Sequence, residues 1–135
     1  MSLLGITKGT ELENTINQLW KGEEQGAATY HALAHIAEEK GLKDMAEVLK
    51  SVANDEARHA GLYGVLNGHV NVDIFTMLSR MSEQETAAAE KIKVIAQQVR
   101  ELGLDKAANE IEIAAIDEIR HGEVLKELVK EYFEK

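Results

Sequence analysis

The chain has 135 residues, a formal net charge of −9, and neither cysteine nor proline. This length suits one domain that buries a sizeable core. An apolar fraction of 44% beside a charged fraction of 29% is typical of globular proteins. The negative charge argues against nucleic acid or an anionic membrane as a partner. The lack of cysteine excludes disulfides, iron–sulfur clusters and a rubredoxin-type iron site built from these residues.

The N-terminal residues lack the basic segment and the apolar core of a signal peptide. No apolar stretch approaches the roughly 20 residues that span a bilayer. We therefore expect a cytoplasmic protein with no membrane partner.

Alanine, leucine, glutamate and lysine dominate the sequence, which favours an all-α fold. Thr10 and Glu13 form a candidate capping box at the start of the first helix. Gly41 and Gly103 lie where consecutive helices must turn, each as the glycine that closes the preceding helix. The pattern predicts four helices, at about residues 10–40, at about 43–66, up to about 102, and at about 105–133.

One motif occurs twice in the sequence. Asp-Glu-x-Arg-His occurs at residues 55–59 and again at 117–121, an offset of 62 residues. At the same offset Glu23 repeats as Glu85, so each of these glutamates precedes the glutamate of its motif by 33 residues. Over 39 positions aligned from Glu23 and Glu85, the two halves share 12 identities. A duplicated helical hairpin is the simplest explanation.

Each predicted helix carries an apolar stripe with steps of three and four residues, the pattern of a four-helix bundle. The stripes of the first and third helices include one glutamate each, and those of the second and fourth include a Glu-x-x-His pair on one helix face. Four unpaired carboxylates in an apolar core would each cost roughly several kcal/mol. No lysine or arginine lies on the stripes to offset them. We therefore predict a site for two metal ions, with six ligands: Glu23, Glu56, His59, Glu85, Glu118 and His121.

Mixed carboxylate and imidazole ligands suit iron, with manganese as the alternative. An alternative interpretation of Glu85 is a capping box with Ser82 at the start of the third helix. Glu24 and Glu90 compete for ligand roles but lie off the stripes. His31 and His35 form an i,i+4 pair beside the stripe, and we interpret them as surface histidines.

Other residues are predicted to support the ligands. Asp55 and Asp117 would each accept a hydrogen bond from the non-ligating nitrogen of a histidine. Pseudo-twofold symmetry pairs Asp55 with His121 and Asp117 with His59. Arg58 and Arg120 would brace these aspartates, or else lie on a solvated helix face. Tyr30 would hydrogen-bond to a ligand carboxylate or carry an electron, with core packing as the alternative.

The doubled Glu-x31-Asp-Glu-x-Arg-His pattern resembles the duplicated motif of ferritin-like di-iron proteins. Within that superfamily the first hairpin is similar to rubrerythrins, through Gly22-Glu23-Glu24-Gln25, Tyr30 and the run 54–59. The resemblance covers about residues 10–133. It implies a ferritin-like four-helix bundle of two duplicated hairpins in a single domain, with two iron ions.

The resemblance also implies reduction of hydrogen peroxide at the four glutamates Glu23, Glu56, Glu85 and Glu118. The rubredoxin domain that usually follows is absent from these residues, so electrons would come from a separate donor such as rubredoxin or a flavoprotein. Rubrerythrins usually carry a further carboxylate three residues after the third-helix ligand, where this chain has Ala88. The site is thus closer to bacterioferritin ferroxidase centres. The alternatives are a ferroxidase that oxidises Fe(II) with dioxygen or peroxide, and a metal-binding bundle without turnover.

The connector between the hairpins has two interpretations, because the second and third helices of such a bundle run parallel. With a first hairpin at 10–66 and a second at 82–133, an extended connector at 67–81 reaches about 50 Å and can return along the bundle. Apolar residues at 74, 78 and 81 instead favour a third helix that begins near Val72. The remaining five or so residues reach about 17 Å, too short for a bundle of more than about 40 Å. The second hairpin would then pack on another chain, as a domain-swapped homodimer; we expect a homodimer in either case.

Overall fold

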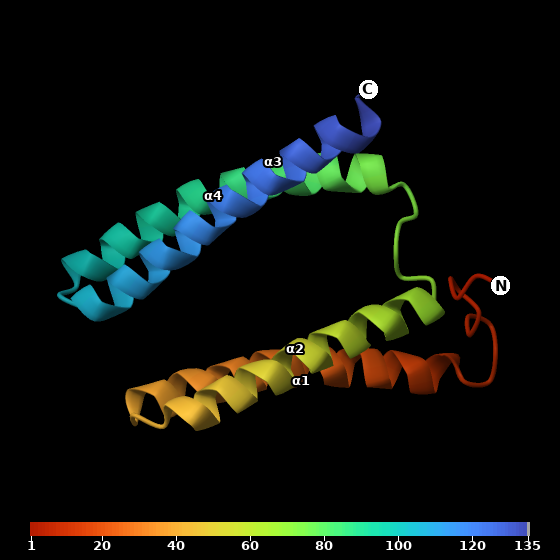
Figure 1. The fold of residues 1–135 in the computed structure, drawn as a ribbon, viewed down its shortest axis with the longest axis horizontal. Helices are drawn as coiled ribbons and strands as arrows, with labels where there is room; N and C mark the ends of the chain where they lie inside the picture. Colours follow the sequence, from red (N-terminus) through yellow and green to blue (C-terminus); the bar gives the residue numbers. More distant parts are fainter. Residues whose placement is uncertain (135) are drawn as a thin grey trace. The chain divides into compact units, whose positions relative to one another are not determined.

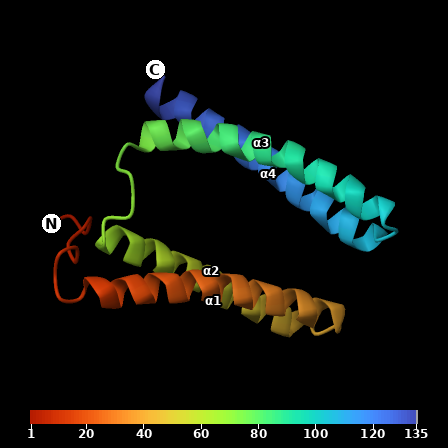
Figure 2. The ribbon, with the colours of Figure 1, turned by 180° about the vertical axis from the view of Figure 1, so that it is seen from behind.

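The computed structural model describes residues 1–134, and this part of the chain is folded into four α-helices without a strand. They are α1 (Glu13–Glu39), α2 (Lys43–Leu66), α3 (Ile74–Glu101) and α4 (Asp105–Phe133). Helices α1 and α2 pack side by side as one antiparallel hairpin, and α3 and α4 as another (Figure 1, and from behind in Figure 2). The predicted all-α class with two helical hairpins is confirmed. No helix among residues 1–134 is both long and apolar enough to cross a membrane.

Both hairpin turns depend on a glycine. Gly41 has a φ of 75° and Gly103 a φ of 77°, in the left-handed region that other residues rarely adopt. After α1, the Leu42 amide donates to the Ala37 carbonyl at 2.8 Å, and the Gly41 amide to the Glu38 carbonyl at 2.9 Å. This is a Schellman ending, and the same two bonds recur after α3. The predicted role of both glycines is confirmed.

Helix α3 begins before residue 82, where the interpretation with an extended connector at 67–81 placed the start of the second hairpin. Asp73 caps it, since its carboxylate accepts bonds from the Thr76 amide at 3.0 Å and the Thr76 hydroxyl at 2.6 Å. The connector therefore covers residues 67–73, rather than extending to 81. Ser82 lies inside α3 and donates to the Gly122 carbonyl at 2.8 Å, which removes the capping-box interpretation of Glu85.

The predicted capping box at the start of the first helix is wrong in detail. Helix α1 begins at Glu13 after Leu12, whose side chain makes no cap. The Glu13 carboxylate instead accepts from the Gly9 amide at 2.6 Å, and the Thr10 hydroxyl accepts from the Leu12 amide at 3.2 Å. Gly9 has a φ of 76°, and its amide, rather than that of Thr10, bonds to the Glu13 carboxylate.

Small residues form the contact within each hairpin. On α2 the residues 46, 53 and 60 are buried alanines, and on α4 the residues 108, 115 and 122 are buried alanines or glycine. This seven-residue spacing keeps one face of each helix turned to its neighbour. Several of these alanines are among the identities shared by the two halves. The duplicated sequence therefore encodes a close helix–helix contact as well as a ligand set.

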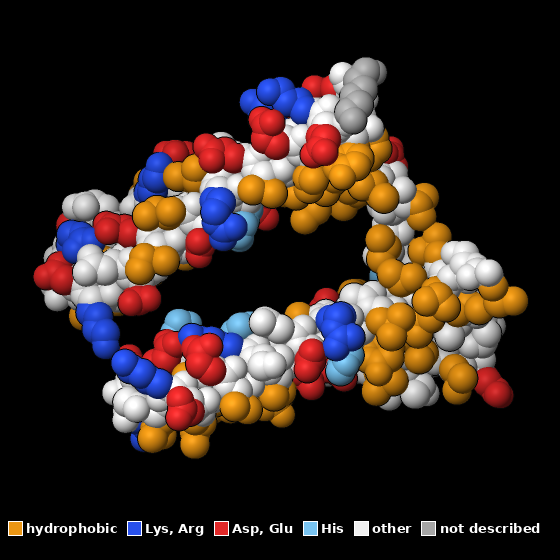
Figure 3. All heavy atoms as spheres, in the orientation of Figure 1, with side chains coloured by type: hydrophobic (Ala, Val, Ile, Leu, Met, Phe, Trp, Pro, Cys, Tyr) orange, Lys and Arg blue, Asp and Glu red, His pale blue; other side chains and the backbone are white. Residues whose placement is uncertain are grey.

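Larger apolar side chains of the predicted stripes remain partly or largely exposed in each hairpin. Leu19 is 41% exposed and Met45 54% in the first hairpin, and Ile95 is 48% exposed in the second. Figure 3 shows apolar side chains at the surface of both hairpins. The chain falls into two compact units, Met1–Val70 and the residues from Asn71 onward, so each hairpin is described by itself below.

A polar cluster closes the open end of the first hairpin. Asn67 is 1% exposed, and its amide nitrogen donates to the Glu13 carbonyl and to Asn17 Oδ1, both at 2.9 Å. His69 Nε2 lies 2.7 Å from the same Asn17 oxygen, and its ring stacks on Trp20 with centroids 4.4 Å apart. The Asn67 Oδ1 atom accepts from the Thr7 hydroxyl, so both ends of this buried side-chain amide are paired. The cluster joins the start of the connector to α1.

Candidate metal centre

The first half-site consists of Glu23, Glu56 and His59. Glu23 comes from α1, and Glu56 and His59 lie one turn apart on α2. One ligand atom from each residue lies within 4.8 Å of the other two, and His59 Nδ1 is 3.6 Å from Glu23 Oε2. All three residues are half-buried on the hairpin. The i,i+3 spacing on α2 turns both side chains toward the same carboxylate of α1.

The second half-site consists of Glu85, Glu118 and His121, and it repeats this geometry. Its ligand atoms also lie within 4.8 Å of one another, and His121 Nδ1 is 3.5 Å from Glu85 Oε2. Glu85 lies on α3, and Glu118 and His121 lie on α4. Thus the six residues predicted from the sequence form two matching groups of three.

Each half-site brings two carboxyl groups together. Hydrogen bonding to Glu23 raises the pKa of Glu56 above its ordinary value, and burial raises it further. In the second half-site, hydrogen bonding to Glu85 and burial raise the pKa of Glu118 in the same way. Without a bound cation, each pair is therefore stabilised by a shared proton.

An unpaired oxygen marks each half-site as suited to a cation. Glu23 Oε2 and Glu85 Oε2 are buried, and neither has a hydrogen-bond partner among the described residues. Buried polar atoms without partners are rare and costly in proteins. Each of these oxygens faces a histidine Nδ1, and a neighbouring carboxylate completes the group. Two carboxylates and one imidazole are a donor set that fits iron or manganese.

The predicted arginine–aspartate pairs are present beside both half-sites. Arg58 Nη2 is 3.0 Å from Asp55 Oδ1, and Arg120 Nη2 is 3.3 Å from Asp117 Oδ1. Arg120 Nη2 also lies 3.4 Å from His121 Nε2. The four charged groups are largely exposed on their hairpins, so each ion pair by itself adds little stability. The predicted bonds from these aspartates to the histidines remain a prediction.

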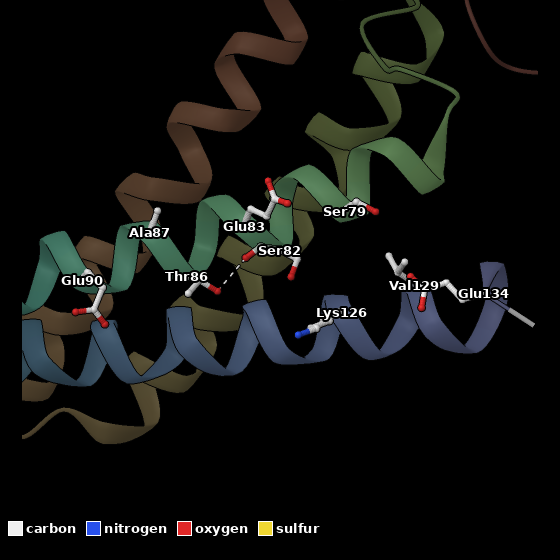
Figure 4. Close-up of a pocket in the computed structure, with 9 residues that line it drawn as sticks. All are labelled: Ser79, Ser82, Glu83, Thr86, Ala87, Glu90, Lys126, Val129 and Glu134. Carbon is white, nitrogen blue, oxygen red and sulfur yellow. Dashed lines mark hydrogen bonds between the residues drawn. The ribbon is translucent and has the colours of Figure 1, made fainter.

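Other candidate residues lie outside the two groups. His31 and His35 are exposed on α1, as are the off-stripe glutamates Glu24 and Glu90 on their helices. Tyr30 is half-buried on α1, two turns after Glu23. A groove of about 540 Å³ runs beside α3 and α4 (Figure 4). Its lining includes Ser82, Thr86 and Lys126 but none of the six predicted ligands.

Gly26 has a place in the first half-site that was not predicted from the sequence. A Cβ atom at Gly26 would lie only 2.7 Å from Glu56 Oε2, so the carboxylate occupies the space that a side chain would need. A glycine inside a helix carries no ligand signal of its own. The alignment of the two halves could have revealed it, because Gly26 is aligned with Ala88 while the ligands around them are identical.

Comparisons with known proteins show the family of the chain. The family model described as rubrerythrin matches residues 17–135. An uncharacterized protein of Methanocaldococcus jannaschii is 35% identical over 130 residues, covering 96% of this chain and 92% of that protein. Reverse rubrerythrin-1 of Clostridium acetobutylicum is 31% identical over 133 residues, covering 96% of this chain and 74% of that protein. No solved structure gives a significant match. With its duplicated Glu and Glu-x-x-His groups, the chain belongs to the rubrerythrin family.

Proposed function

We propose that the two half-sites bind two iron ions in one di-metal centre, with manganese as the alternative metal. The observation that carries the proposal is the pair of buried, partnerless oxygens on Glu23 and Glu85, each beside a second carboxylate and an imidazole. A divalent cation would satisfy these oxygens and offset the carboxylate charges. Family membership supports iron.

Each ligand would have a defined task. His59 and His121 would coordinate through Nδ1, the nitrogen that faces a glutamate in each half-site. Their Nε2 atoms would then donate to Asp117 and Asp55, respectively, with Arg120 moving away from His121 Nε2, and these bonds would hold the rings in place. Glu56 and Glu118 must release the shared proton before both carboxylates of a half-site can bind a cation. Metal binding is therefore coupled to proton release.

We propose that the centre reduces hydrogen peroxide. When bound, two ferrous ions would supply one electron each, and with two protons one peroxide molecule would yield two water molecules. The four glutamates, ionised when the metals are bound, would hold the two iron ions, and the two protons consumed would come from solvent. A separate protein, such as rubredoxin or a flavoprotein, would return the electrons. These 135 residues have no cysteine with which to build such an iron site themselves.

Ferroxidase activity is the second candidate. Ala88 lies three residues after Glu85, so α3 offers no further carboxylate at that position. The ligand set is therefore four glutamates and two histidines, distributed equally between the hairpins. This ligand set is similar to that of bacterioferritin ferroxidase centres, and the likeness supports a centre that oxidises Fe(II) with dioxygen or peroxide. A metal-binding bundle without turnover is the third outcome.

We further propose a homodimer in which α3 and α4 of one chain complete the bundle begun by α1 and α2 of another. The seven connector residues reach at most about 25 Å. Helix α3, with 28 residues, is about 42 Å long. A connector of this length cannot return along the helix to place α2 and α3 parallel within one chain. Exchange between two chains removes that requirement.

Metal analysis tests the centre first. Protein purified without chelators should contain about two iron or manganese ions per chain. Glu85→Ala should lower this content, whereas Glu24→Ala is the matched control, because Glu24 is exposed and outside both half-sites. A metal-free wild-type protein, or a Glu85→Ala protein with full metal content, would refute the assignment.

Stopped-flow oxidation of the di-ferrous protein then distinguishes the activities. Faster oxidation by peroxide than by dioxygen supports the peroxidase. Oxidation by dioxygen at a comparable or higher rate supports the ferroxidase. A reduced state that persists against both oxidants supports a binding protein.

A further inference from the structure

The two half-sites differ at one aligned position. Their ligands correspond residue by residue at the offset of 62, yet Gly26 on α1 corresponds to Ala88 on α3. Each lies three residues after its helix's glutamate ligand, so each is one helical turn away on nearly the same face. At this position the second half-site therefore has one methyl group more than the first.

The backbone does not require a glycine at position 26. Gly26 lies inside α1, and it is not among the glycines with positive φ. A glycine in a helix interior is less favourable than alanine. The role of Gly26 must therefore depend on the side chains that surround it.

That space is occupied by a ligand. A Cβ atom at Gly26 would lie 2.7 Å from Glu56 Oε2 and 3.5 Å from Glu56 Cδ. The first distance is shorter than a carbon–oxygen van der Waals contact. The Glu56 carboxylate thus lies against the backbone of α1 in a position that a methyl group would forbid. In the second half-site the aligned residue is Ala88, which carries the methyl group that Gly26 lacks.

We propose that Gly26 is a positioning residue that makes the two metal positions unequal. This inference rests on the proposed di-metal centre. Glu56 can use the space beside the Gly26 backbone, which it occupies in this structure, whereas the Ala88 methyl would exclude Glu118 from the corresponding space. A ligand that is already restrained loses less freedom when it binds. The metal held by the second half-site is therefore bound more tightly, and the Glu56 side of the centre is the more adaptable one.

Cobalt(II) titration of the metal-free full-length protein tests the inference. Its visible absorption reports on each bound ion without any need for turnover. Wild-type protein should bind two equivalents in two resolved steps, about tenfold apart in affinity, the lower end of effects from residues around metal ligands. Gly26→Ala should make the first half-site resemble the second, so that both cobalt ions bind in one step at the tighter affinity. Ala88→Gly should instead give one step at the weaker affinity.

Matched variants exclude a general effect of the substitution. Gly22→Ala makes the same change one turn earlier on α1, where a new Cβ meets nothing within 4 Å, and it should leave both steps unchanged. Gly26→Ala should fold as well as wild type, because only the far end of a flexible side chain has to move. Thermal unfolding of the metal-free variants checks this.

The outcomes separate the two proposals. Failure to bind cobalt at all would overturn the di-metal centre and this inference together. Two equivalents bound in a single step by wild-type protein would overturn the inference alone. Two steps that persist unchanged in both Gly26→Ala and Ala88→Gly would do so as well.

Discussion

At the scale of single residues, the site depends on carboxylates that lack enough partners. Glu23 and Glu85 each keep a buried oxygen without a hydrogen bond, although each lies beside a second glutamate and a histidine. Such an arrangement is costly in an empty protein and favourable around a cation. The same residues should therefore make the metal-free protein sensitive to pH.

The pH dependence has a definite sign. The pKa values of Glu56 and Glu118 are raised in the folded protein by hydrogen bonding to their partner glutamates. Their contribution to the stability of the metal-free protein is complete below the ordinary glutamate pKa, and it is lost as pH rises through the raised values. Thermal unfolding from about pH 4 to about pH 8 should show this loss.

The control is the Glu56→Gln/Glu118→Gln variant, in which the shared protons are replaced by amides. Its stability should depend less on pH over the same range. Bound metal should reverse the trend for wild-type protein, since both carboxylates must be ionised to bind it. A metal-free wild-type protein that becomes more stable across this window would contradict the shared-proton interpretation.

At the scale of the helices, each hairpin is defined by its glycine turn and by its small buried residues. Ala53 and Ala115 occupy the same place in the two hairpins, with 0% and 1% of their surface exposed. Residues of this size let the backbones approach, and the larger side chains then point to the remaining faces. A bulky substitution on the alanine face should therefore be more destabilising than one at an exposed position of the same helix.

Ala53→Leu should destabilise the metal-free protein by about 1–3 kcal/mol, because an added side chain cannot be accommodated in a filled contact. Chemical denaturation measures this free energy of unfolding. Val48→Leu is the control on the same helix, since Val48 is 63% exposed, and it should change stability by less than about 0.5 kcal/mol. Equal effects of the two substitutions would show that the alanine contact is not tightly packed.

The turn glycine gives a second prediction at this scale. Gly41→Ala should cost about 1–2 kcal/mol, because the left-handed backbone at this position crowds a Cβ atom. Gly61→Ala lies within α2, where a Cβ meets nothing within 4 Å, and should instead stabilise the protein by up to about 1 kcal/mol. Denaturation midpoints that move in the same direction for both variants would argue against this account.

At the scale of the whole molecule, the proposed exchange of hairpins makes each metal centre the product of two chains. Large apolar side chains remain uncovered on each hairpin, including Leu19, Met45 and Ile95. Each hairpin also holds only three of the six ligands. We expect a dimer by light scattering in solution.

Mixing two defective chains tests the exchange. One chain carries alanines in place of Glu23, Glu56 and His59, and the other carries alanines at the three ligands of the second half-site. Neither alone can build a complete centre. After unfolding and refolding together, an exchanged dimer of the two should contain one intact centre, or about a quarter of all centres in a statistical mixture. An unchanged lack of two-metal binding in a mixture that does form mixed dimers would exclude the exchange.

The sequence by itself determined the features that depend on short distances along the chain. Glutamate and histidine three residues apart share a helix face, and a glycine at a turn permits a left-handed backbone, so Glu56 with His59, Gly41 and Gly103 were predictable. The duplication also made Glu23 and Glu85 predictable, because residues separated by the same offset occupy equivalent positions in the two hairpins. The tertiary structure decided the Asn67 cluster that joins the connector to α1 and the contact between Glu56 and Gly26. These features depend on how closely two segments far apart in the sequence approach each other. A glycine in the sequence indicates that a close approach is possible, but it does not identify the side chain that makes the contact.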